Sequence, residues 1–130
     1  MAANDLTKIL YVEDDAFIQR IAQIALQKVG GFDVKICNSG QQALAEAPVF
    51  MPDLILLDMM LPEMDGLMIQ SALKQNPATA EIPVVFMTAR VQAEEVEEYR
   101  RRGAIGVIFK PFEPMTLASK LRELWCNRHI

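Results

Sequence analysis

Short apolar runs alternate with longer amphipathic segments along the chain. Five runs of four to six residues consist mainly of aliphatic side chains, and they cover residues 9–12, 34–37, 54–57, 82–87 and 105–109. Hydrophobicity that is continuous rather than alternating is typical of strands covered on both faces, as in a parallel sheet. The runs therefore predict five buried parallel strands.

The segments between these runs have the spacing of amphipathic helices. Residues 16–29 are expected to form a helix that Gly30 and Gly31 end, and its core-facing stripe would consist of Ile18, Ala22, Ala25 and Val29. Four further helices are expected: from the N-cap Ser39 through Glu46, ended by Pro48; from Asp65 and Gly66 through Gln75; over residues 93–102, ended by Gly103; and from Glu113 and Pro114 onward.

Five strand–helix units of this size predict a three-layer α/β domain with right-handed crossovers. An open, doubly wound sheet is favoured over a closed barrel, because a barrel needs about 250 residues and the chain has 130. That length suits one domain, and no repeat or linker marks off a second one. We expect a single domain over residues 1–130, with its core over about residues 7–127 and no output domain.

Charge and composition narrow the classes of partner. The net charge of −4 argues against a nucleic-acid-binding protein. The longest apolar stretches are interrupted by acidic residues and the start lacks the pattern of a signal peptide, so we expect a cytoplasmic protein with no membrane span. Cys37 and Cys126 have no CxxC partner and are expected to be reduced thiols.

Polar residues follow four of the expected strands. Ligands of open α/β sheets bind at the carboxyl ends of the strands. The residues expected to converge there are Glu13, Asp14 and Asp15 after the first run, Asp58 after the third, Thr88 after the fourth and Lys110 after the fifth. One residue of this set, Asp15, is expected to be a helix N-cap.

Clustered carboxylates repel one another unless a cation neutralises them. A set of oxygen ligands with no His or Cys nearby selects a hard ion, and Mg²⁺ usually shares its shell with a phosphate oxygen. An aspartate at such a site can act as a nucleophile and form an acyl phosphate. The strand ends thus predict phosphoryl chemistry on a carboxylate.

Four segments carry a family resemblance: YVEDD, LLDMMLPEMDG, FMTAR and FKPF. With these motifs in this order, the chain resembles a receiver domain of the two-component response regulators from about Thr7 to Trp125. The resemblance implies a flavodoxin-like sheet with strand order 2-1-3-4-5 and a cis Lys110–Pro111 bond. It also implies the site roles: Asp58 as phosphoacceptor, Asp14 as direct Mg²⁺ ligand, Glu13 as a ligand acting through water, the backbone carbonyl of Met60 as a further ligand, Thr88 and Lys110 as the groups that meet the phosphoryl group, and Pro62 and Gly66 as the residues that shape the loop.

The resemblance further implies a signalling switch. A sensor histidine kinase or a histidine phosphotransfer protein would supply the phosphoryl group, and the surface of the fourth and fifth strand–helix units would change to control a partner. A homodimer through the fourth helix, fifth strand and fifth helix is a further possibility. We expect no enzyme activity beyond assistance to the chain's own phosphorylation and dephosphorylation. Three alternatives stay open: a receiver-like interaction module that takes no phosphate, a phosphatase that uses Asp58, and a flavin mononucleotide carrier, which the acidic first loop disfavours.

Some positions depart from the family pattern. Val107 stands where the family often has an aromatic residue that moves on activation, so signalling could use the Thr88 loop or Tyr99, or Val107 could simply be sheet core. Met60 and Arg90 lie where the family tunes hydrolysis of its acyl phosphate, and the apolar Met60 side chain predicts a long-lived phospho-form. The helix over residues 93–102 has few apolar anchors and is expected to pack loosely, with ion pairs from Glu97 to Arg101 and from Glu98 to Arg102.

Overall fold

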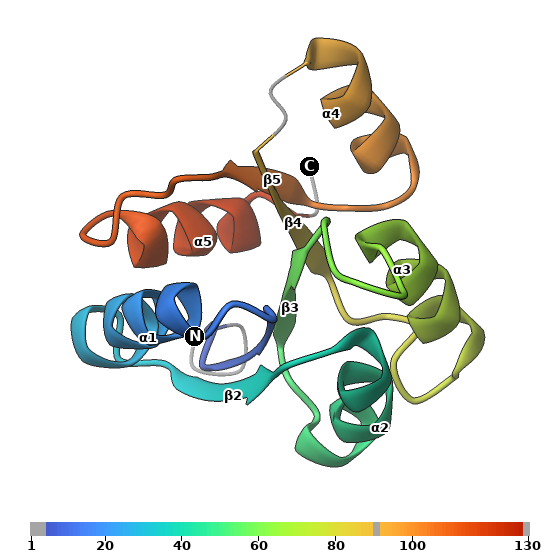
Figure 1. Ribbon diagram of the computed structural model, residues 1–130, viewed down its shortest axis with the longest axis horizontal. Coiled ribbons are helices and arrows are strands. Elements are labelled where there is room, and N and C mark those ends of the chain that lie inside the picture. Colours follow the sequence, from blue (N-terminus) through green and yellow to red (C-terminus); the bar gives the residue numbers. More distant parts are fainter. Residues whose placement is uncertain (1–4, 90–91, 129–130) are drawn as a thin grey trace.

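The computed structural model describes residues 5–89 and 92–128, and within them five parallel strands form one sheet in the order β2-β1-β3-β4-β5. The strands are β1 (Lys8–Val12), β2 (Asp33–Cys37), β3 (Leu54–Asp58), β4 (Val84–Thr88) and β5 (Gly106–Phe109). This order confirms the flavodoxin-like doubly wound sheet (Figure 1). The first strand lies between β2 and β3, so the order reverses beside β1, where such sheets bind ligands.

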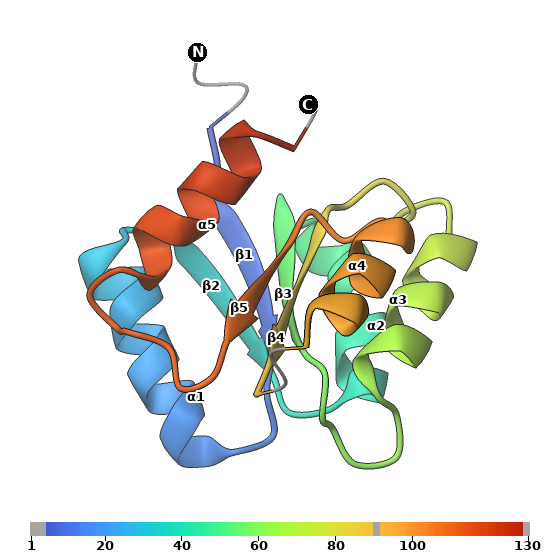
Figure 2. The same ribbon diagram turned by 90° about the horizontal axis from the view of Figure 1, so that it is seen from above.

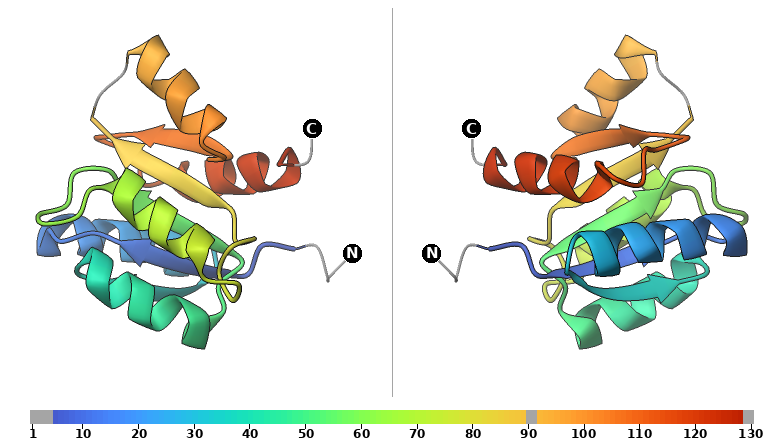
Figure 3. Two further views of the ribbon diagram at one scale, coloured as in Figure 1. Left: turned by 90° about the vertical axis from the view of Figure 1, so that its right-hand side faces the viewer. Right: turned by 90° about the vertical axis from the view of Figure 1, so that its left-hand side faces the viewer.

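Helices cover both faces of the sheet. They are α1 (Ala16–Gln23) with its continuation η2 (Ile24–Val29), α2 (Gly40–Phe50), α3 (Gly66–Gln75), α4 (Ala93–Arg101) and α5 (Leu117–Cys126). Figure 3 shows the two faces in turn, with α2 and α3 over one and α1 and α5 over the other. None of the helices within residues 5–89 and 92–128 has the length and hydropathy of a membrane span.

Side chains of the strands alternate between two separate cores. Ile9 and Tyr11 of β1 pack toward α1 and α5, whereas Leu10 and Val12 pack toward the helices on the other face. Every residue of β3 is buried. Both faces are therefore apolar, which explains why the strands appear in the sequence as continuous hydrophobic runs.

The first helical segment differs from its expected stripe. Its second half is a π-helix, in which the Gly30 amide donates to the Ala25 carbonyl over 3.1 Å. The wider turn brings Leu26 and Gly30 to the core, whereas Val29 is 45% exposed. The expected burial of Val29 was wrong because it assumed 3.6 residues per turn throughout.

Two expected helix boundaries were also wrong. Pro48 lies inside α2, which continues to Phe50 and ends where Met51 takes a left-handed φ of 54°. Glu113 and Pro114 form a turn ahead of α5, in which the Thr116 and Leu117 amides both donate to the Glu113 carbonyl over 3.1 Å. Pro48 lies within the last turn of α2 rather than at its end, and α5 begins about one helical turn after Glu113 and Pro114.

Candidate functional site

The polar residues expected to converge do lie together at the carboxyl edge of the sheet. The loops that follow β1, β3 and β5 leave the sheet at this edge (Figure 2). Glu13, Asp14 and Asp58 each offer a carboxylate oxygen, and these oxygens all lie within 4.8 Å of one another. An all-oxygen set of this size fits a hard divalent cation such as Mg²⁺.

Asp58 is the last residue of β3 and is 2% exposed. Its Oδ1 accepts a hydrogen bond from the Met60 amide over 3.1 Å, and its Oδ2 accepts one from the Lys110 ammonium over 3.1 Å. The carboxylate is thus fixed by a neutral donor from the loop after β3 and a cation from the segment after β5. The Met60 side chain is 63% exposed, at the mouth of the site rather than in the core.

Glu13 follows β1 and is 1% exposed. Its Oε1 accepts hydrogen bonds from Lys110 over 2.9 Å and from the Tyr11 hydroxyl over 3.1 Å, and its Oε2 accepts one from the Asp15 amide over 3.3 Å. Burial raises the pKa of Glu13, and the charge of Asp58 raises it further, although the bond from Lys110 opposes the change. The net direction is upward because burial, helped by the charge of Asp58, outweighs the contributions of the donors.

The next two acidic residues have different environments. Asp14 is exposed, so its carboxylate faces solvent at the rim of the cluster. Asp15 caps α1, since its Oδ1 accepts from the Phe17 amide over 2.9 Å and from the Ile18 amide over 3.1 Å. The expected N-cap role of Asp15 is confirmed.

Lys110 lies just beyond β5, and its side chain is 18% exposed. Burial by itself lowers the pKa of this ammonium, but hydrogen bonds and charge from Glu13 and Asp58 outweigh it and leave the pKa raised. The Lys110 amide donates to the Thr88 carbonyl over 2.9 Å, which joins the ends of β4 and β5. The Lys110–Pro111 bond is cis, as expected.

Thr88 is the last residue of β4 and is fully buried. Its neighbour Met87 pairs with Asp58 in the sheet register, and Thr88 pairs with Phe109. The residue therefore lies on the strand between the one that carries Asp58 and the one that leads to Lys110.

Two supporting residues were missed by the sequence reasoning. The Tyr11 hydroxyl bonds to Glu13, and the Gln19 side-chain amide donates to the Glu13 carbonyl over 2.5 Å and to Asn38 Oδ1 over 2.8 Å. Tyr11 could have been found, because residues two apart on a strand share a face. Gln19 gave no such signal, because its partners come from two different loops.

The fourth helix has one buried residue, Tyr99. Tyr99 is 6% exposed, and its ring lies against Phe86 of β4 with the ring centroids 5.2 Å apart. Tyr99 is thus an anchor of α4 on the sheet that the sequence analysis did not count, while the other residues of the helix stay at least partly exposed. The expected ion pair of Glu98 with Arg102 is present over 2.9 Å, but Arg101 pairs with Glu98 over 3.0 Å rather than with Glu97. These hydrogen bonds lower the pKa of Glu98.

Val107 is half-buried against the same core cluster as Phe86 and Tyr99. It pairs directly with Phe86 in the sheet register. Arg90, which we expected to affect hydrolysis, lies outside the described residues.

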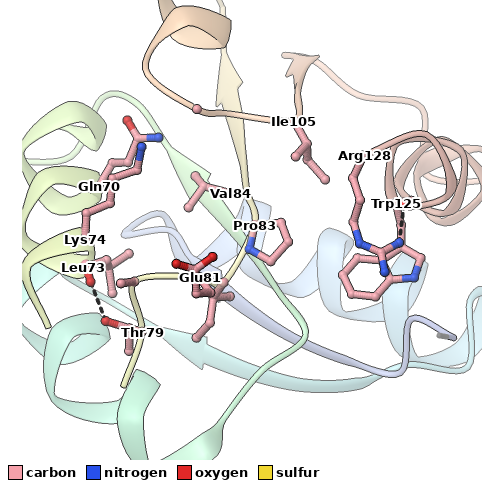
Figure 4. A pocket seen from close by; sticks show the side chains of 13 residues that line it. Gln70, Leu73, Lys74, Thr79, Glu81, Pro83, Val84, Ile105, Trp125 and Arg128 are labelled. Carbon is pink, nitrogen blue, oxygen red and sulfur yellow. Dashed lines mark hydrogen bonds between the residues drawn. The ribbon is translucent and has the colours of Figure 1, made fainter. Parts of the chain in front are cut away.

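A hollow of about 400 Å³ lies at the opposite edge of the sheet. Pro83 and Val84 line it at the start of β4, with Lys74 of α3 and Trp125 of α5 beside them (Figure 4). None of the acidic cluster residues lines this hollow, so the two features are separate.

Comparisons with known proteins agree with this geometry. The family model of the response regulator receiver domain matches residues 9–122. The DNA-binding response regulator MtrA of Mycolicibacterium paratuberculosis is 36% identical over 115 residues, which are 88% of this chain and 49% of that protein. The DNA-binding dual master transcriptional regulator RpaA of Synechocystis is 34% identical over 119 residues, which are 92% of this chain and 49% of that protein.

The chain spans about half the length of these curated relatives. Among solved structures, the chemotaxis protein CheY4 of Vibrio cholerae has a TM-score of 0.83 and 29% identity, and the match covers 92% of this chain and 98% of that one. Since the family model covers most of the chain and the strand order is that of the fold, the chain belongs to the response regulator receiver domain family.

Proposed function

We propose that this chain is a phosphoacceptor switch in which Asp58 takes a phosphoryl group from a phosphohistidine of a partner protein. The observation that carries the proposal is the setting of Asp58: its carboxylate is buried, lies between the Met60 amide and the Lys110 ammonium, and has the carboxylates of Glu13 and Asp14 within 4.8 Å. Receiver domains of this family are signalling switches rather than enzymes with a separate substrate.

Glu13, Asp14 and Asp58 would hold Mg²⁺, and the backbone carbonyl of Met60 is proposed as a further ligand. The donor chemistry fits, because every candidate ligand atom is an oxygen and three carboxylates exceed the charge of one lysine. When bound, Mg²⁺ neutralises the carboxylates and draws charge from the phosphoryl oxygens.

In the proposed transfer, an Asp58 oxygen attacks phosphorus while the bond from phosphorus to the histidine nitrogen breaks, and the partner's imidazole leaves. Lys110 already bonds to Asp58, so its ammonium is in place to offset the charge of the new acyl phosphate. Thr88, at the end of the adjacent strand, would donate a hydrogen bond from its hydroxyl to a phosphoryl oxygen.

The surface beside the site supports a protein as phosphodonor. Phe17 is 74% exposed, and a largely apolar hollow of about 360 Å³ extends from it along Pro111, Phe112 and Pro114 to Lys110. Exposed apolar surface next to a reactive group is typical of an interaction site. We propose that a sensor histidine kinase or a histidine phosphotransfer protein docks here.

The output surface is proposed to comprise the fourth and fifth strand–helix units. Thr88 is followed by the segment that leads into α4, and Tyr99 ties that helix to Phe86, two residues before Thr88. A shift of Thr88 toward the phosphoryl group would therefore reach α4 through this aromatic pair, without an aromatic residue at position 107. A homodimer through α4, β5 and α5 stays a proposal, as do the cytoplasmic location and the absence of nucleic-acid binding.

The proposal is tested by intact mass. The wild-type protein is incubated with Mg²⁺ and acetyl phosphate, alongside Asp58→Asn and the control Asp15→Asn, which keeps the cap of α1. One phosphoryl adduct on the wild type and on Asp15→Asn, with none on Asp58→Asn, is the expected result. No adduct on any variant would favour an interaction module that takes no phosphate, and continuous consumption of the donor would favour a phosphatase.

A further inference from the structure

The hydroxyl of Tyr11 contacts the acidic cluster from the core that lies between the sheet and helices α1 and α5. Tyr11 is fully buried in the core between the sheet and the helices α1 and α5. Its hydroxyl donates to Glu13 Oε1 over 3.1 Å and lies 3.8 Å from the Met87 sulfur. Phenylalanine would supply the same apolar ring, so packing alone does not require the hydroxyl. Burying a hydroxyl costs free energy unless it forms a hydrogen bond, and here the strong acceptor is Glu13.

Glu13 and Asp58 compete for one cation. The Lys110 ammonium lies 2.9 Å from Glu13 and 3.1 Å from Asp58, and both carboxylates are almost fully buried. A carboxylate with too few donors would draw the ammonium toward itself. The Tyr11 hydroxyl gives Glu13 a second side-chain donor without adding charge, so the ammonium remains available to Asp58.

We propose that Tyr11 is a positioning residue for the phosphoryl-transfer site: its hydroxyl fixes the Glu13 carboxylate and thereby keeps Lys110 between Glu13 and Asp58. The inference rests on the proposed function, since it assigns Tyr11 a role in the same reaction. Tyr11 does not touch the reacting atoms and acts only through Glu13 and Lys110.

The test compares Tyr11→Phe with Thr79→Val. Thr79 has a buried hydroxyl that donates to the Leu73 carbonyl over 2.6 Å at the opposite edge of the sheet (Figure 4). Each substitution removes one buried hydroxyl and leaves a side chain of similar shape, so both should lower the free energy of unfolding. With saturating Mg²⁺ and acetyl phosphate, Tyr11→Phe is expected to slow adduct formation on Asp58 roughly tenfold, whereas Thr79→Val changes the rate less than twofold.

A double-mutant cycle tests whether Tyr11 acts through Glu13. In a Glu13→Gln background, where the charge that binds Lys110 is gone, adding Tyr11→Phe is expected to change the rate less than twofold. The contact between Tyr11 and Glu13 can also be measured without metal, by ¹⁹F NMR. The chain has two tyrosines, so the second one, Tyr99, serves as an internal control. In protein labelled with 3-fluorotyrosine, Glu13→Gln is expected to shift the ¹⁹F signal of Tyr11 and leave that of Tyr99 in place.

The outcomes separate the inference from the proposed function. If the wild type forms the adduct and Tyr11→Phe reacts as fast as Thr79→Val, Tyr11 is core packing and the inference is overturned. Additive effects of Tyr11→Phe and Glu13→Gln would also overturn it. A wild type that forms no adduct would overturn the proposed function and the inference with it, while the ¹⁹F shift would still measure the contact of Tyr11 with Glu13.

Discussion

The ammonium of Lys110 lies 3.1 Å from Asp58 Oδ2, although 52 positions separate the two residues in the sequence. The contact exists because the carboxyl ends of β3 and β5 lie at the same edge of a parallel sheet, with β4 between them. Lys110 is thus the cation that pairs with Glu13 and Asp58, the two buried carboxylates among residues 5–89 and 92–128. The stability of the metal-free protein should depend on it strongly.

Replacement of Lys110 by Met is expected to lower the free energy of unfolding by about 3 kcal/mol without Mg²⁺, because two buried carboxylates lose their shared cation. Urea unfolding measures the change. The matched control is Lys120→Met, since Lys120 is an exposed lysine on α5 and should change the free energy by less than about 0.5 kcal/mol. Equal losses in the two variants would contradict the structural role of Lys110.

Mg²⁺ should raise the stability of the wild type because it binds the folded cluster and not the unfolded chain. At a concentration one hundred times the dissociation constant, the gain is about 2.7 kcal/mol. Asp58→Asn should raise the stability of the metal-free protein, since it removes one of the charges that raise the pKa of Glu13, and should reduce the gain from Mg²⁺. Thermal unfolding with and without Mg²⁺, with EDTA to remove the ion, measures both effects. A larger gain from Mg²⁺ in Asp58→Asn than in the wild type would argue against a metal site at these carboxylates.

Met60→Asn is expected to shorten the lifetime of the phosphorylated protein several-fold. The side chain of Met60 is exposed at the mouth of the site, two residues after Asp58, and it has no strong donor or acceptor to order an attacking water. An asparagine amide can hold such a water near the phosphorus. Decay of the intact-mass adduct after removal of the phosphodonor measures the lifetime, and Met68→Asn, at an exposed methionine of α3, is the control. Unchanged or slower decay in Met60→Asn would count against this account.

The two cysteines should differ in reactivity. Cys37 is buried, and burial followed by the charge of Glu46 raises its pKa to about 11, whereas Cys126 is exposed. At pH 8 only about one Cys37 thiol in a thousand is ionised, so iodoacetamide should add once to the native protein, at Cys126. Peptide mapping checks the site, and a second addition should appear in urea.

The same shift in pKa affects stability at high pH. The folded state keeps the Cys37 thiol protonated up to about pH 11, whereas the unfolded chain ionises it near its ordinary pKa of 9.0. The unfolded state therefore loses the proton first, and the contribution of Cys37 to the free energy of unfolding falls between about pH 9 and pH 11. Cys37→Ser should weaken this part of the pH dependence.

Much of the fold and the site followed from the sequence because both depend on local pattern. Runs buried on two faces gave the parallel strands, and the carboxyl ends of parallel strands meet at one edge, so Asp14, Asp58 and Lys110 could be placed together before any coordinates. The N-cap role of Asp15 was equally local, since a cap bonds to amides two and three residues away.

Only the tertiary structure showed that Glu13 and Asp58 share one ammonium group, that of Lys110. Whether one ammonium serves two carboxylates depends on rotamers and burial, and no spacing in the sequence encodes that Lys110 lies within 3.1 Å of both Glu13 and Asp58. The π-helix that leaves Val29 exposed and the packing of Tyr99 on Phe86 were likewise seen only in the tertiary structure. Local patterns determine which residues form strands and helices, whereas contacts between distant residues determine the geometry and the charge balance of the site.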